Sequence, residues 1–138
     1  MNLLIIDGQG GQLGSGIIRA VLERFPEVQI TAVGTNATAT AAMVKAGAKK
    51  AATGENPVRV ASKKADIIIG PIGIVISDSM LGEITPEMAR AVGSCDAVRI
   101  LIPMNKCENI VAGVPMLSVS QLIEDALNKL GEILKNNS

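Results

Sequence analysis

The sequence predicts an α/β protein with a doubly wound, mostly parallel sheet and helices on both faces. Short apolar runs alternate with helix-like segments along all 138 residues. Two runs, residues 3–6 and 67–69, are continuously apolar, as strands buried on both faces are. The first run leads through a glycine-rich turn into an amphipathic segment. We therefore expect a three-layer architecture and a single domain over residues 1–138.

The composition excludes several classes of function. The 13 basic and 13 acidic residues balance, so nothing indicates nucleic-acid binding. The chain has no apolar stretch long enough for a membrane span, and its start lacks the basic flank of a secretory signal. Two cysteines, Cys95 and Cys107, are too few for a disulfide scaffold, so we expect a cytoplasmic protein with reduced thiols.

Missing residue types narrow the chemistry further. The chain has no histidine, so a Ser-His-Asp or Cys-His arrangement cannot form within it, and no His/Cys cluster indicates zinc. It has no tyrosine, so the Tyr-x-x-x-Lys pair of short-chain dehydrogenases is absent. The apolar fraction is 48% with a single aromatic residue, which predicts an aliphatic core and favours a homo-oligomer that covers some apolar surface.

The glycine-rich turn at residues 7–16 is the main candidate site. Three glycines repeat at every third position, and a helix is expected to follow over residues 17–25. Strand, glycine turn and helix are typical of a nucleotide-binding Rossmann-type unit, in which backbone amides at the helix start hold a phosphate. A tight turn that binds nothing is the alternative. The predicted phosphate contacts are Gly8, Gln9, Gly10, Gly11, Gln12, Leu13 and Gly14.

A second group of candidates follows the strand expected at residues 28–33. A dinucleotide fold usually carries an acidic residue there for the ribose hydroxyls, but this chain has Gly34, Thr35 and Asn36. This departure makes NAD(P) a less favoured ligand and favours a mononucleotide, a flavin or another phosphate ligand. We expect these three residues to meet the next group of the ligand, such as a ribose; alternatively Asn36 caps the helix expected at residues 37–46.

A third group closes the far side of the predicted site. Gly70 and Pro71 end the strand expected at residues 66–70, and residues 72–76 either extend it or form a loop over the pocket. Ser77, Asp78 and Ser79 then predict a lid with polar contacts to the ligand, or else an ordinary turn.

The remaining elements are predicted from local signals. Lys106, in a polar loop, is a candidate phosphate contact, although a solvated lysine is commoner; a basic neighbour could activate Cys107. The other expected features are a strand within residues 48–54, a cap at Asn56 with Pro57 opening a helix, a cap at Thr85, strands at 97–102 and 110–114, and a capping box at Ser118 that opens the final helix.

Four short stretches together resemble a small bacterial family, domain of unknown function 3842. They are residues 6–11 (IDGQGG), 66–71 (DIIIGP), 81–86 (LGEITP) and 102–107 (IPMNKC). The resemblance covers essentially the whole chain and implies a compact Rossmann-like domain. It supplies no catalytic residues, because the family carries no established activity. The glycine turn alone resembles that of the extended and atypical short-chain dehydrogenases.

Taken together, the sequence predicts a nucleotide- or dinucleotide-binding or sensing module without evident catalytic residues. The ligand would be a small phosphate-bearing molecule, with NAD(P) as one possibility. One alternative is a small NAD(P)- or flavin-dependent oxidoreductase whose site is completed by a dimer partner. Another is an oligomeric scaffold whose glycine turn is empty.

Overall fold

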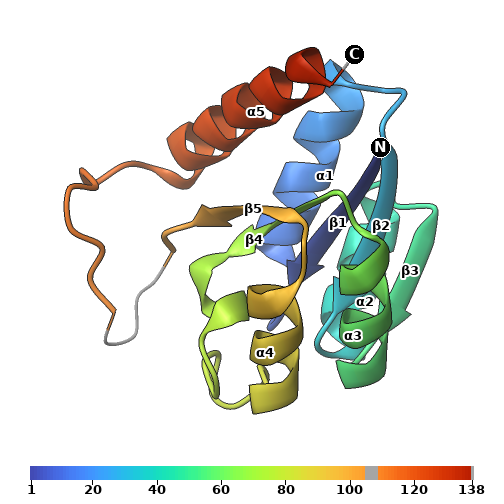
Figure 1. Ribbon diagram of the computed structural model, residues 1–138, viewed down its shortest axis with the longest axis vertical. Coiled ribbons are helices and arrows are strands. Elements are labelled where there is room, and N and C mark those ends of the chain that lie inside the picture. The colour runs from blue at the N-terminus through green and yellow to red at the C-terminus, as the bar shows by residue number, and fades with distance from the viewer. Residues whose placement is uncertain (105–108, 138) are drawn as a thin grey trace.

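The computed structural model describes residues 1–104 and 109–137. Within them the chain forms one parallel sheet with strand order β3-β2-β1-β4-β5 (Figure 1). The neighbours in this sheet all pair in parallel. The strands are β1 (Asn2–Asp7), β2 (Gln29–Gly34), β3 (Lys50–Thr53), β4 (Ile67–Pro71) and β5 (Val98–Ile102).

Helices cover both faces of the sheet and make a three-layer α/β fold. One face carries α1 (Gln12–Arg24), α2 (Ala37–Lys45) and α5 (Val119–Asn136). The other face carries α3 (Glu55–Lys64) and α4 (Pro86–Ser94). The alternation of strands with crossover helices confirms the doubly wound class predicted from the sequence.

The central strand shows why its sequence is apolar at every position. Leu3 and Ile5 pack in the core under α1 and α5, whereas Leu4 and Ile6 pack in the core under α3 and α4. All four side chains are at most 1% exposed. Burial of each such side chain contributes about 1.5–3 kcal/mol, so a polar substitution on either face of β1 would be costly.

The strand order creates a crevice between β1 and β4. From β1 the chain moves through α1 to β2 and then through α2 to β3, all on one face. It returns across the opposite face through α3 to β4. The connections that leave β1 and β4 therefore diverge at the carboxyl edge of the sheet, which is where ligands bind in open α/β folds.

Several local predictions are confirmed. Asn36 caps α2, because its side chain accepts a hydrogen bond from the Ala39 amide. Thr85 caps α4 in the same way, with proline at the start of the helix. The capping box at Ser118 is complete, with Gln121 as its partner.

Other predictions need correction. Residues 110–114 form no strand and pair with none of the five strands of the sheet; Gly113 has a φ of 80°, and Ile110 is 97% exposed. Helix α3 begins at Glu55 after Gly54, so Asn56 is not its cap. Helix α1 begins at Gln12, well before the expected residue 17, for a reason given below.

The segment after β4 turns away from the sheet instead of extending the strand. Residues Ile72–Val75 form a short 3-10 helix, η1. Lys106 and Cys107 lie outside the described residues.

Candidate functional site

Asp7, the last residue of β1, holds the start of α1 in place. The helix has Gly11 at its N-cap position, which provides no side chain for capping. Asp7 supplies the missing acceptor from across the turn: its Oδ2 accepts from the Gly14 amide at 2.7 Å and its Oδ1 from the Gly8 amide at 2.8 Å. This long-range cap explains why the helix starts at Gln12 and includes Gly14.

The three regularly spaced glycines are required by neighbouring protein atoms. A methyl group on Gly14 would lie 2.6 Å from the Met43 sulfur, and one on Gly11 would lie 2.7 Å from the Ala39 carbonyl oxygen. Gly11 also has a left-handed φ of 72°. A methyl group on Gly8 would meet Thr35 Oγ1 at 2.6 Å. The G-x-x-G-x-x-G pattern is therefore explained by the close approach of the turn to β2, α2 and the loop after η1.

Gly10 is different from these three glycines. It has no positive φ, and a methyl group on it would find no atom of the described residues within 4 Å. It is exposed, and its amide makes no hydrogen bond within the described part of the chain. The Gln12 amide, at the first position of α1, has no partner there either. Within the described residues, these two amides of the turn therefore have no internal acceptor.

A carboxylate from a distant loop closes the β2 side of the turn. Glu83 Oε1 accepts from the Gln9 amide at 2.8 Å, from Thr35 Oγ1 at 2.6 Å and from Asn36 Nδ2 at 2.9 Å. Asn36 Nδ2 also donates to the Gln9 carbonyl at 3.0 Å. We call Gln9, Thr35, Asn36 and Glu83 the Glu83 network. It holds Gln9 in the left-handed region, with a φ of 50°.

The loop that carries Glu83 is tightly folded. It joins η1 to α4, and three of its non-glycine residues, Asp78, Met80 and Leu81, have positive φ values. Backbone hydrogen bonds within the loop, such as Asp78 N to Ile84 O at 2.7 Å, offset this strain. The same loop places Met80 over the pocket and Glu83 on the far side of Gly8.

The two carboxyl groups at the turn have opposite pKa shifts. Burial raises the pKa of Asp7, although amide donors from Gly14 and Gly8 oppose the shift and the negative Glu83 adds to it. Burial also acts to raise the pKa of Glu83, but hydrogen bonds from Thr35, the Gln9 amide and Asn36 outweigh it, so the pKa lies below its ordinary value. Both carboxyl groups accept backbone amides near the start of α1, where the helix dipole favours negative charge.

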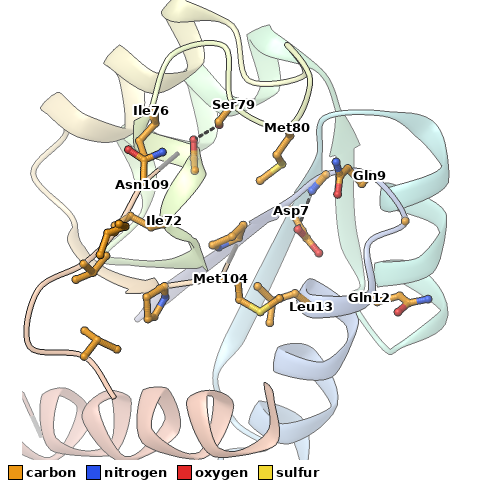
Figure 2. A pocket seen from close by; sticks show the side chains of 18 of the residues that line it. Asp7, Gln9, Gln12, Leu13, Ile72, Ile76, Ser79, Met80, Met104 and Asn109 are labelled. Atoms are coloured by element: carbon orange, nitrogen blue, oxygen red, sulfur yellow. Dashed lines mark hydrogen bonds between the residues drawn. The ribbon is translucent and has the colours of Figure 1, made fainter. Parts of the chain in front are cut away.

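A pocket of about 690 Å³ opens on the other side of the turn. It lies at the carboxyl ends of β1, β4 and β5, at the crevice where the sheet changes direction. Figure 2 shows Met80 and Ile72 from the β4 connection and Met104 from the β5 connection around this hollow, facing Leu13 of α1. Both the size and the mainly apolar wall are typical of small-molecule sites.

The segment after β5 forms the outer wall of the pocket. Within this segment, residues 109–118 bow away from the sheet before the chain reaches α5 (Figure 1). Asn109, Ile110, Val114 and Met116 line the pocket from this segment. Ile110 is 97% exposed and Met116 is fully exposed, so this wall presents apolar side chains to solvent as well.

The structure separates the candidate residues into those that line the pocket and those that do not. Residues Gly8, Gln9, Gly10, Gly11, Gln12, Leu13, Pro71 and Ser79 line it. Gly14 is buried in α1, Gly34 packs against Thr40, and Gly70 packs against the Ile6 carbonyl. Thr35 and Asn36 belong to the Glu83 network. Ser77 and Asp78 lie in the loop away from the lining, and the Ser79 hydroxyl donates to Gly73 O at 2.5 Å.

Sequence reasoning missed the roles of Asp7, Glu83 and the methionines. Asp7 stands directly before the glycines, which was a usable signal for a cap. Glu83 lies 74 residues after Gln9, and nothing in its own neighbourhood announces that contact. Met80 and Met104 come from separate connections, so only the folded chain brings them into one wall.

The fold and pocket together define a class. This is a three-layer α/β protein of Rossmann-like architecture, with a pocket at the switch point of its parallel sheet. Residues 2–135 match the family model described as "Domain of unknown function (DUF3842)", and the chain belongs to this family. No curated protein matches the sequence. Within the described residues, no helix has the length and apolar character to cross a membrane.

Proposed function

We propose that the protein is a nucleotide-binding module whose ligand occupies the pocket at the ends of β1, β4 and β5. Gly10 carries this proposal. Its backbone conformation, its open surroundings and an amide that has no partner among the described residues give no internal reason for glycine, which has an entropic cost on folding. A ligand that approaches the backbone closely at this point supplies such a reason.

The pocket offers two kinds of contact to a nucleotide. The amides of Gly10 and Gln12, which have no partner in the part of the chain that the structure describes, suit a phosphate oxygen at the start of α1. The apolar side chains of Ile72, Met80 and Met104 suit a base or ring system. The described lining contains no lysine or arginine, so we expect binding to depend only weakly on ionic strength.

Binding or sensing is favoured over catalysis. In the described lining Asp7 is the single carboxyl group, and its two oxygens accept backbone amides. It therefore has a structural task and is poorly placed to act as a general base. The small NAD(P)- or flavin-dependent oxidoreductase completed by a partner subunit stays a prediction, as do the homo-oligomer and the cytoplasmic location.

A thermal-shift experiment tests the proposed function. The panel contains NAD(H), NADP(H), FMN, FAD and the adenine nucleotides, and at least one is expected to raise the melting temperature by linkage. Gly10→Ala should weaken the binding of that ligand. Gly10→Val should raise its dissociation constant by about tenfold or more, which corresponds to about 1.4 kcal/mol of binding free energy.

Gly93→Ala is the matched control. Gly93 lies in α4, where an added methyl group also meets no described atom within 4 Å, and it is not among the residues that line the pocket. This variant should bind as the unmodified protein does. An unchanged melting temperature with every ligand of the panel, or an unchanged affinity in Gly10→Val, would contradict the proposal.

A further inference from the structure

We infer that the ligand has the size of a single nucleotide and that Glu83 determines this by excluding a second one. The inference rests on the proposed function and narrows it. A dinucleotide lies across the crevice of such a sheet, with its pyrophosphate along the glycine turn and one ribose at the end of the second strand. In this protein the β2 end of that path is occupied by the protein itself.

The first observation is steric. A methyl group built on Gly8 would lie 2.6 Å from Thr35 Oγ1, 2.7 Å from the Met80 sulfur and 2.9 Å from Glu83 Oε1. The loop after η1 is therefore in contact with the turn at Gly8, and no ligand atom fits between them. The described lining of the pocket reaches Met80 and Gln9, but it includes none of the other members of the Glu83 network, Thr35, Asn36 and Glu83.

The second observation concerns hydrogen bonds. The donors that a dinucleotide would use beyond Gly8 are the Gln9 amide, the Thr35 hydroxyl and the Asn36 side-chain amide. All three donate to one oxygen, Glu83 Oε1, at 2.6–2.9 Å. A ribose or phosphate placed there must displace a carboxylate from three donors at once, and bonds to a charged acceptor are the stronger ones.

The third observation is charge. A pyrophosphate over Gly8 would lie between the carboxyl groups of Asp7 and Glu83, whose mutual repulsion contributes to the raised pKa of Asp7. Like charges in a partly buried site repel more strongly than in water. A single phosphate at Gly10 and Gln12 avoids this position. Glu83 is therefore a specificity-determining residue: it stands where the ribose acid of a dinucleotide fold would act, but it is turned toward the protein.

Isothermal titration of the full chain tests this inference. The dinucleotides NAD⁺ and FAD are compared with their halves, AMP, nicotinamide mononucleotide and FMN. We expect at least one half to bind, and each dinucleotide to bind less than about tenfold more tightly than its better half. A dinucleotide that binds about tenfold more tightly or better would overturn the inference and leave the proposed function intact. No binding by any of them would overturn both.

Variants of Glu83 test the residue itself. Because Glu83→Ala opens the β2 side of the glycine turn, the ratio of dinucleotide to mononucleotide affinity should rise at least about threefold. Glu87→Ala is the control, because it removes an exposed carboxylate of α4 that pairs with Arg90 away from the turn. Amide hydrogen exchange at Gln9 should accelerate in Glu83→Ala alone. An unchanged affinity ratio, or unchanged Gln9 exchange, would remove Glu83 from the role assigned to it.

Discussion

The two sides of the glycine turn differ in what their polar groups do. On the β2 side, the Glu83 network uses the polar groups that sequence reasoning assigned to a ligand. On the β4 side, apolar side chains surround a pocket and the Gly10 amide has no partner in the described chain. The comparison teaches that a polar residue in an expected ligand position is informative only if the fold has left its hydrogen-bonding groups unused.

Removing the Asp7 carboxylate, which supports the turn on both sides, should have the largest effect on stability. Asp7→Ala leaves the Gly8 and Gly14 amides without their acceptor at the start of α1. We expect the free energy of unfolding to fall by about 2–4 kcal/mol, since each buried donor without a partner costs about 1–3 kcal/mol. Urea denaturation measures this. Asp7→Asn should lose less, because its amide oxygen still accepts one bond; equal stability of Asp7→Ala and the parent protein would refute the cap.

A pair of cap substitutions compares the β2 side of the glycine turn, closed by the Glu83 network, with the β4 side, where the pocket opens. Asn36→Ala removes the α2 cap and the bonds to Glu83 and the Gln9 carbonyl. Ser118→Ala removes the capping box where the outer wall of the pocket meets α5. Either loss of a cap should cost about 1 kcal/mol. Asn36→Ala should cost about 1 kcal/mol more, because it also opens the Glu83 network.

Chemical denaturation of these two variants under identical conditions gives the difference. If both lose the same stability, Asn36 acts as a helix cap alone and the network contributes nothing on the closed side.

The contributions of Glu83 and Asp7 to the free energy of unfolding should change in opposite directions with pH. Glu83 has a lowered pKa in the folded state, so its contribution is present above its ordinary value of 4.5 and is lost as pH falls through the folded value. Asp7 has a raised pKa, so its contribution is present below 3.8 and is lost as pH rises through the folded value. These effects should be the smallest of the series, because Glu83 is partly solvated.

Urea denaturation across this pH range, with Glu83→Gln and Asp7→Asn as references, checks the signs. The stability advantage of the parent protein over Glu83→Gln should shrink on acidification below 4.5. Its advantage over Asp7→Asn should shrink as pH rises above 3.8. Slopes of the same sign would mean that the two carboxyl groups are not held in the opposed environments described above.

Local sequence patterns predicted most of the fold for physical reasons that act over a few residues. The apolar runs of β1 and β4 follow from burial on two faces, and the caps at Thr85 and Ser118 follow from side chains that reach amides three positions ahead. The strand expected at residues 110–114 failed because β-branched residues favour a strand only where a neighbour offers hydrogen bonds.

The sequence by itself determined the α/β class, the order of the elements and the turn that leads into α1, since each depends on short-range geometry and burial. Only the tertiary structure decided which side of that turn is open. Glu83 reaches Gln9 across 74 positions, and α2 and the loop after η1 set the space around Gly8 and Gly11. Such contacts are chosen by packing among distant segments, which no local pattern of side chains encodes.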